Sequence, residues 1–258
     1  MMHVMQSLLH FSQNTESDTE ESNTSDSEDE VELAQNQSNL TEEDFSTVQA
    51  LLLHFVPPEL AKAILDAAQY WPCISAKNVQ YTGVLAEVAN GNNAAAYYLV
   101  TPVIPTKHPH LKVEMVKFNI ASCDQGWGGD ANNRGTYNGS YTWFEAGIMR
   151  GVSDVSVPPI MLVNRVDDFD ADAFNGGSAK EIVNSLERDR RWKLQYNMQV
   201  SSTVREHEVI WTKHDIIDDA AEASARARGA GTGRGFVSTL APGDRIVIVG
   251  RAQVTQSH

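Results

Sequence analysis

Lysine and arginine are absent from the first fifty residues of this 258-residue chain, which contain twelve aspartates and glutamates. The remainder holds twenty-two acidic and twenty basic residues, so it is nearly neutral although the whole chain carries a net charge of −14. Binding to nucleic acid depends largely on a basic surface that meets the phosphates. The charge distribution therefore argues against nucleic acid as a partner.

Cysteine is equally scarce, with only Cys73 and Cys123. Two cysteines are too few for a disulfide framework, and their spacing is not that of a metal site. No apolar run is long enough to span a membrane, and the first residues lack the positive charge of a secretory signal. We therefore expect buried thiols in an intracellular protein that has neither a cofactor nor a membrane partner.

Residues 12–40 contain Ser, Thr, Asn and acids with few apolar side chains. Such a composition cannot offset the entropy of ordering, so residues 1–40 are predicted to be a disordered acidic tail. Ser17, Ser25 and Ser27 each have an acid three residues downstream, as an acid-directed kinase of the casein-kinase-2 type prefers. They are candidate phosphorylation sites, and the alternative is a solubilising tail with incidental matches.

Residues 41–72 carry the signals of a helical hairpin. Thr41 and Asp44 resemble a capping box, and Pro58 suits the first position of a second helix. Apolar residues at helical spacing define the face that we expect this second helix to bury: Leu60, Ile64, Ala67 and Trp71. The two apolar faces should pack on each other or on the domain that follows.

From residue 79 onward the apolar period changes to two. Trp192–Val200 alternates apolar and polar residues throughout, as in a half-buried antiparallel strand. Further strands are expected at Val79–Val88, Ala95–Thr101, Lys112–Ser122, Thr136–Ile148, Ile160–Val166, His207–Lys213 and Asp244–Val254. The sequence therefore predicts a mainly β domain over residues 79–258, an antiparallel β-sandwich of the jelly-roll type, with strand tryptophans in its core.

Two irregular insertions interrupt this pattern. Residues 167–191 include a stretch, Ala179–Leu186, that is expected to form a short helix. Residues 215–234 end in RARGAGTGRG, which is interpreted as a flexible cationic loop. Long loops on a β domain are frequent places for binding sites.

A glycine-rich stretch supplies the candidate ligand-binding residues. Asp124 and Gln125 could hydrogen-bond a sugar or a polar peptide while Trp127 stacks on it. The alternative is a structural corner, in which Trp127 plugs one end of the domain and Asp124 bonds loop amides. Glu145 is a further candidate; it shares a face with Trp143 and would need a partner such as an Arg if that face is buried.

The chain contains no GxSxG elbow, no HExxH helix and no Cys–His signature. Asp124 and Glu145 are candidates for hydrolysis by paired carboxylates, although no spacing rule joins them. We accordingly expect no catalytic set and no metal site.

Several separated motifs, among them PPELAKAILDAAQYW, CDQGWGG, YTWFEAGI and GRGFVSTLAPGDRIVIVGRA, occur in the same order in a family of uncharacterised fungal proteins, which the chain resembles over roughly residues 55–252. The resemblance implies an F-box-like helical segment followed by a galactose-binding-like β-sandwich. It also implies that a Skp1-type adaptor binds the first motif, through Pro58, Leu60, Ile64 and Leu65. Val56 departs from the F-box pattern, which has Leu there, and family members continue past the GDRI strand into a further strand.

Three hypotheses follow. The preferred one is a non-enzymatic binding module that recognises a protein or glycan through loops of the sandwich. The second is an F-box-type substrate adaptor of a ubiquitin ligase. The third is a carboxylate-dependent hydrolase.

Overall fold

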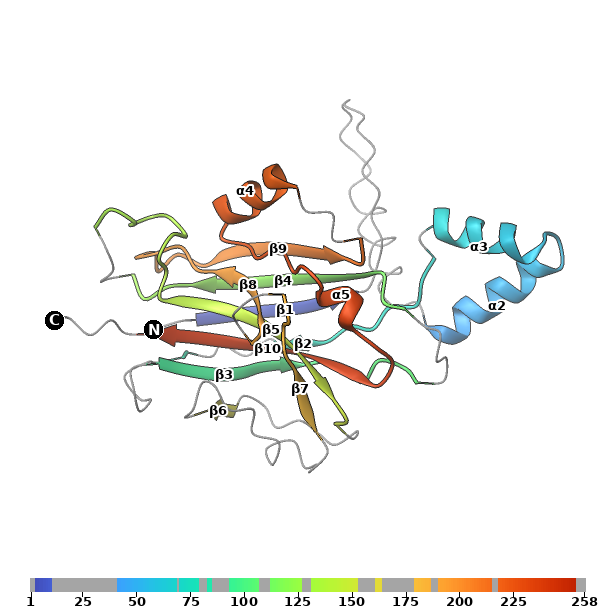
Figure 1. The fold of residues 1–258 in the computed structure, drawn as a ribbon, viewed down its shortest axis with the longest axis horizontal. Helices are drawn as coiled ribbons and strands as arrows, with labels where there is room; N and C mark the ends of the chain where they lie inside the picture. Colours follow the sequence, from blue (N-terminus) through green and yellow to red (C-terminus); the bar gives the residue numbers. More distant parts are fainter. Residues whose placement is uncertain are drawn as a thin grey trace, which may run out of the picture.

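The computed structural model describes residues 3–10, 41–68, 70–78, 83–84, 93–106, 112–126, 131–152, 161–163, 179–186, 190–214 and 218–253. Over these residues the chain is mostly β, with two antiparallel sheets and a pair of short helices ahead of most of the strands (Figure 1). None of the helices in the described residues has the length and apolar character needed to cross a bilayer.

Sheet A contains four strands in the order β2 (Lys77–Asn78), β1 (His3–His10), β4 (Met115–Cys123) and β9 (Arg205–Thr212). Strand β1 pairs with β4 along most of its length. It lies within residues 1–40, the segment that the composition predicts to be an acidic tail. Residues 11–40, including Ser17, Ser25 and Ser27, lie outside the described residues.

Sheet B has the order β6 (Met161–Val163), β3 (Asn93–Val100), β10 (Asp244–Gln253), β5 (Thr142–Arg150) and β7 (Lys180–Ile182). An additional strand, β8 (Trp192–Tyr196), pairs with the first half of β5, while β7 pairs with its end. Strand β5 therefore has a continuous partner, β10, on one side and two short partners on the other.

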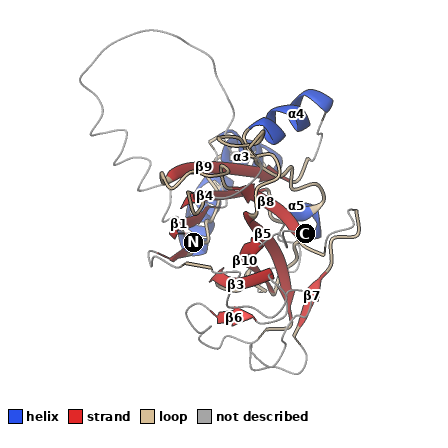
Figure 2. Cartoon of the chain, turned by 90° about the vertical axis from the view of Figure 1, so that its left-hand side faces the viewer, coloured by secondary structure: helices blue, strands red, loops and turns tan. Residues whose placement is uncertain are grey.

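Alternate residues of β5 define the two faces of sheet B. Phe144, Ala146 and Ile148 belong to one large core, to which Phe118 and Trp211 of sheet A also contribute. Figure 2 shows β1, β4 and β9 on one side of this core and β3, β5 and β10 on the other. The opposite, outer face of sheet B is also buried, by a second apolar cluster that contains Tyr97, Met149, Ala179, Val247 and Val249. Strands buried on both faces lose the alternation of apolar and polar residues.

The helical hairpin is formed by α2 (Glu42–Leu53) and α3 (Pro58–Ala67), which stand to one side of the sheets (Figure 1). The predicted capping box at Thr41 and the proline at the first position of α3 are both confirmed. The predicted buried face of α3 is wrong, because Leu60 and Ile64 are 54% and 43% exposed. Ala61 and Leu65, one position further along, are buried instead.

The strands predicted at Ala95–Thr101, Lys112–Ser122, His207–Lys213 and Asp244–Val254 lie close to β3, β4, β9 and β10, whereas other predicted strands differ at their ends. Strand β5 begins at Thr142, six residues later than predicted, because the chain makes turns around Asn138 and Gly139 first. Of the predicted strand Val79–Val88 only residues 83–84 are described, and they are not in a strand.

The alternation predicted over Trp192–Val200 is wrong beyond Leu194. The pairing of β8 with β5 shifts register between Phe144 and Glu145, which is a β-bulge. After the bulge the opposite set of side chains points inward, so the polar residues Gln195, Asn197 and Gln199 are buried. A single inserted residue therefore reverses the faces that the alternation indicated.

Both insertions differ from their sequence-based interpretation. The predicted helix Ala179–Leu186 is wrong, because Lys180–Ile182 pairs with the end of β5 as strand β7. The second insertion forms α4 (Asp219–Ala227) and a close-packed segment at residues 228–234, and α5 (Phe236–Thr239) follows it. The segment is not a flexible loop, since its backbone bonds to Leu194 and Tyr196 of β8.

Candidate functional site

The residues near Asp124 form a structural corner between the two sheets. Asp124 lies just beyond β4, where its Oδ1 accepts a hydrogen bond from Thr142 Oγ1 (3.1 Å) and its Oδ2 accepts one from the Val200 amide (2.9 Å). Val200 has φ +60°, a strained value for a β-branched residue, and the bond to Asp124 helps to hold it there. The structural alternative therefore describes Asp124 better than ligand binding does.

Two further candidates, Gln125 and Trp127, come from the same stretch as Asp124. Gln125 is half-buried beside Asp124. Trp127 lies outside the described residues.

Glu145 lies on the outer face of sheet B, where the pairing of β5 with β8 and β10 determines its neighbours. Trp143 lies directly opposite Tyr196 on β8 and Arg251 on β10. Glu145 lies opposite Lys193 on β8. Directly paired residues project from the same face of a sheet, so these five side chains are neighbours.

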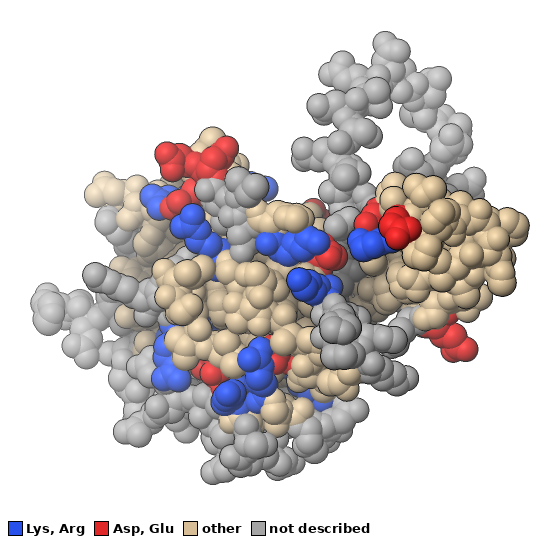
Figure 3. Space-filling model, turned by 45° about the vertical axis from the view of Figure 1, so that its right-hand side comes forward, with Lys and Arg blue, Asp and Glu red and all other residues tan. Residues whose placement is uncertain are grey.

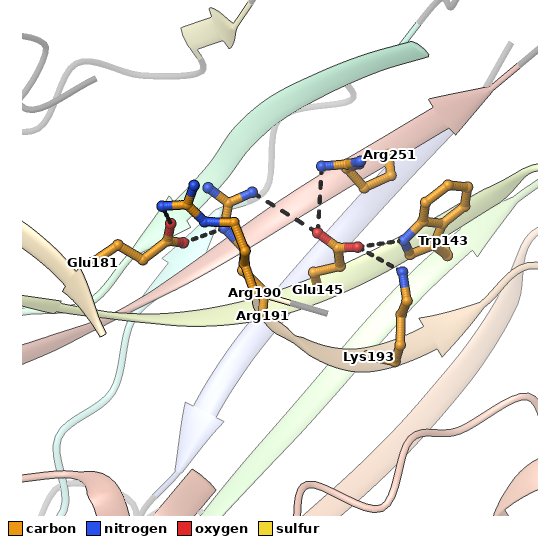
Figure 4. A network of polar contacts seen from close by, with 7 residues as sticks. All are labelled: Trp143, Glu145, Glu181, Arg190, Arg191, Lys193 and Arg251. Atoms are coloured by element: carbon orange, nitrogen blue, oxygen red, sulfur yellow. Dashed lines mark hydrogen bonds and ion pairs between the residues drawn. The ribbon is translucent and has the colours of Figure 1, made fainter. Parts of the chain in front are cut away.

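Three cations surround the buried carboxylate of Glu145 (Figure 4). Lys193 Nζ lies 2.7 Å from Oε1, while the guanidinium nitrogens of Arg251 and Arg191 lie 3.5 and 3.9 Å from Oε2. The indole Nε1 of Trp143 donates a further hydrogen bond to Oε1 (2.8 Å). The conditional prediction that a buried Glu145 needs a partner such as an Arg is confirmed, with Lys193 as the nearest cation and two arginines beyond it.

The cations decide the protonation of Glu145. Burial by itself raises the pKa of this carboxyl. Arg251 and Lys193, with hydrogen bonds from Lys193 and Trp143, act in the opposite direction and hold the pKa below its ordinary value of 4.5. Glu145 is therefore ionised near neutral pH.

The network continues along β5 to a second buried carboxylate. Arg191, 6% exposed, binds Glu181 of β7 through Nε, and Arg190 approaches Glu181 from the more exposed side. Gly147 of β5 provides the space for this crossing, because a Cβ there would lie 3.2 Å from Glu181 Oε1 and 2.9 Å from Val247. The cluster ties β7, β8 and β10 to the outer face of β5.

A pocket of about 600 Å³ opens at the end of this face. Its wall includes side chains of three aromatic residues, Tyr137, Trp143 and Tyr196. The polar and charged residues that line it are Asn138, Ser140, Lys193, Glu222, Arg226, Thr232 and Gln253. Glu145 supports this lining from beneath, through its bonds to Trp143 and Lys193.

Glycines bring the second insertion close enough to complete the pocket. A Cβ on Gly229 would lie 2.6 Å from the Tyr137 ring, and one on Gly231 would lie 1.8 Å from the carbonyl oxygen of Lys193. Between them Ala230 forms a bridge to Gln195. The backbone of residues 229–231 thus lies directly against β8 and the loop that precedes β5.

The two carboxylates that were candidates for a catalytic pair, Asp124 and Glu145, lie toward opposite faces of β5. Asp124 bonds Thr142, which points to the inner face of β5, whereas Glu145 projects from the outer face. The two carboxylates are therefore not a pair, and the expected geometry of a paired-carboxylate hydrolase is absent for these residues. Glu145 bonds two residues that line the pocket, Trp143 and Lys193, whereas the carboxylate of Asp124 bonds Thr142 and Val200.

Sequence reasoning missed the aromatic and charged lining of the pocket. The stretch TYNGSYTWFE, which contains Tyr137 and Trp143, was singled out by composition but not linked to the second insertion. Tyr196 was assigned to a regular alternation, and the bulge in β8 was not foreseen. Trp143, Trp192 and Trp211 are all buried, as predicted for strand tryptophans.

The two cysteines differ in their exposure. Cys123 is buried and Cys73 is half-buried. Across the part of the chain that the structure describes, no group of three or more His, Cys, Asp or Glu side chains could hold a metal ion.

Comparison of the chain with protein-family models, curated proteins and solved structures gives no match.

Proposed function

We propose that this protein is a non-enzymatic binding module that recognises a glycan in the pocket at the end of the outer face of sheet B. The observation that carries this proposal is the lining itself, in which aromatic rings alternate with amide, hydroxyl and charged groups. Sugar rings have apolar faces and polar edges, and this combination of side chains complements both.

The size and construction of the pocket support the same conclusion. About 600 Å³ is within the ordinary range of small-ligand sites. Tyr137 and Tyr196 are only half-buried, so their rings present surface to a ligand. The cationic groups of Lys193 and Arg251 lie 4.6 and 5.5 Å from the centroid of the Trp143 ring. These contacts hold the ring in place in the lining of the pocket.

The fold and cell location that accompany this function are also proposals. We propose a galactose-binding-like β-sandwich of the jelly-roll type, which is supported by two antiparallel sheets that share one core and by the motifs that resemble the fungal family. An intracellular location is supported by the scarcity of cysteine.

The test is a glycan array probed with the full chain, followed by titration of any glycan that binds. Tyr196→Ala should weaken that glycan by about tenfold, because it removes an aromatic face from the wall. The control is Phe55→Ala, which removes a 78% exposed ring from the helical hairpin and should leave affinity unchanged. The absence of any bound glycan at millimolar concentration would refute the proposal.

The hairpin favours a second candidate, an F-box-type adaptor of a ubiquitin ligase. Five large apolar side chains of the hairpin are exposed: Leu51, Leu53, Phe55, Leu60 and Ile64. Figure 3 shows that most of the hairpin surface in that view carries no charged side chain. Leu65 is 2% exposed, so we assign the adaptor contact to the exposed residues Pro58, Leu60 and Ile64.

The adaptor proposal is tested by purifying the tagged chain from fungal extract and identifying bound proteins. A Skp1-type adaptor should accompany the intact chain and be lost from the double variant Leu60→Asp, Ile64→Asp. Because both side chains are exposed, the substitutions should leave the fold intact. Purification of the intact chain without any such adaptor would contradict this candidate.

A further inference from the structure

The charged side chains that line the pocket are arranged in opposite pairs. Lys193 Nζ lies 2.7 Å from Glu145 Oε1, and an Arg226 guanidinium nitrogen lies 3.1 Å from Glu222 Oε1. Both cationic side chains of the described lining thus have a carboxylate within hydrogen-bonding distance, and Lys193 shares its carboxylate with Arg251 and Arg191. A ligand in the pocket meets dipolar pairs in place of an isolated charge.

The Lys193 pair is the more firmly fixed of the two. The side chains of Lys193 and Glu145 are 23% and 7% exposed, and the ammonium group lies 4.6 Å from the centroid of the Trp143 ring. The ammonium group donates a hydrogen bond to Glu145 Oε1. Lys193 is therefore held as a hydrogen-bond donor at a defined place on the pocket wall.

The Arg226 pair has a different role at the rim. The two side chains lie four residues apart on α4 and are 76% and 54% exposed. An ion pair this exposed adds little to stability. The pair places guanidinium donors beside carboxylate acceptors at the rim. Adjacent hydroxyl groups of a sugar can bond both, because each hydroxyl is a donor and an acceptor.

We infer that the pocket selects a neutral, hydroxyl-rich sugar and discriminates against acidic sugars, with Lys193 as the specificity-determining donor and Glu145 as the residue that positions it. The inference rests on the proposed function of glycan binding. A carboxylate on the ligand would have to compete with Glu145 for Lys193 and would meet the like charge of Glu222 at the rim. A hydroxyl group accepts a bond from Lys193 without that penalty.

The experiment compares oligosaccharides of glucose, mannose and galactose with their uronic-acid counterparts, which differ only in carrying a carboxylate at carbon 6. Titration of the full chain should show that a neutral sugar binds at least about tenfold more tightly than its acidic counterpart. Raising NaCl from low to high concentration should change the affinity for the neutral sugar by less than about twofold, because that sugar carries no charge for salt to screen.

Two variants test the role of the lysine. Lys193→Met should weaken the neutral sugar about tenfold or more by removing a charged donor. Its control is Lys117→Met, since Lys117 also lies 2.7 Å from a carboxylate, Glu208, but on sheet A away from the pocket. Glu145→Gln, once shown by circular dichroism to be folded, should raise affinity for the acidic sugar relative to the neutral one, because Lys193 loses its neutralising partner.

The outcomes separate this inference from the function on which it rests. Tight, salt-insensitive binding of a neutral sugar that is lost in Lys193→Met supports both. Binding that is equal or tighter for the acidic sugar overturns the inference and leaves glycan binding in place. Failure of every sugar in both series overturns the proposed function and the inference with it.

Discussion

The indole ring of Trp211 leaves no space for a side chain at position 233, so only glycine fits there. Gly233 has φ +65°, and a Cβ at this position would lie 2.1 Å from Cδ2 of the ring. The ring is 2% exposed, and its Nε1 donates to the Gly231 carbonyl (2.9 Å), so it has no free direction in which to move. At Gly233 the backbone of the second insertion therefore packs directly against a core side chain, Trp211.

Gly233→Ala should lower the free energy of unfolding by about 3 kcal/mol, from left-handed strain and overpacking together. Denaturation in urea measures the loss. Gly135→Ala is the matched control, because Gly135 has φ +73° but a Cβ added there would meet no atom within 4 Å. It should lose only about 1 kcal/mol, and equal losses in the two variants would refute the contact with Trp211 as the cause.

Glu145 couples the stability of the outer face to pH. Its folded-state pKa is lower than in the unfolded chain, so its ionic contribution is complete above the ordinary value of 4.5 and is lost as pH falls through the folded pKa. At pH 7, Glu145→Gln should cost about 3 kcal/mol, because it leaves buried cations without their carboxylate.

Urea denaturation of both proteins at several pH values between 7 and 3 measures this coupling. The difference in unfolding free energy between them should shrink as pH falls from 4.5 toward the lower folded pKa, because the carboxyl of the unfolded wild type takes up its proton first and that of the folded protein follows. Other acids titrate in both proteins and cancel in the difference. A difference that stays constant across this range would show that Glu145 acts by shape alone.

At the scale of elements, helix α2 owes its start to a local motif. Thr41 Oγ1 accepts a hydrogen bond from the Asp44 amide, and Asp44 Oδ2 accepts one from the Thr41 amide (3.0 Å). These reciprocal bonds satisfy two backbone donors that the first turn leaves without a partner. Hydrogen bonds from the Thr41 hydroxyl (2.6 Å) and then from the Thr41 amide lower the pKa of Asp44, so its carboxylate stays ionised at the positive end of the helix.

Thr41→Ala should destabilise α2 by about 1 kcal/mol. Hydrogen exchange of the α2 amides measures this loss locally, where global unfolding need not change. Thr47→Ala is the comparison, because Thr47 lies inside the helix, bonds the Glu43 carbonyl, and is replaced by a better helix former. Protection should be unchanged or higher in that variant; equal loss in both would argue against capping.

At the scale of the whole molecule, four aromatic rings join the two sheets. Phe118 and Trp211 of sheet A meet at 4.9 Å between centroids, and Phe236 of α5 contacts Trp211 at 4.9 Å and Trp192 of sheet B at 5.1 Å. Edge-on pairs at these distances are favourable beyond the area they bury. Helix α5 thus inserts one ring between the sheets.

Phe118→Ala should therefore lower the free energy of unfolding by about 3 to 5 kcal/mol, through a cavity that both sheets line. Chemical denaturation followed by tryptophan fluorescence measures it, since Trp211 reports on the same site. Phe55→Ala, which removes the same side chain from an exposed position, should stay within about 0.5 kcal/mol of the wild type. Similar small effects in both variants would contradict a shared core.

Features that depend on residues close together in the chain could be predicted from the sequence alone. The cap at Thr41, the proline start of α3 and the approximate places of β3, β4, β9 and β10 all follow from local backbone preferences and short-range periodicity. The need of a buried Glu145 for a partner such as an Arg was also foreseen, because a buried charge requires compensation wherever it lies.

Only the tertiary structure decided which faces are buried and which side chains form the site. The bulge in β8 reverses the faces after Leu194, and pairing with β5 makes a strand of Lys180–Ile182 in place of a helix. The pocket unites Tyr137, Tyr196 and Arg226, which come from three separate segments. Register and packing between distant segments arise from contacts that no local pattern encodes, so neither could be predicted from the sequence.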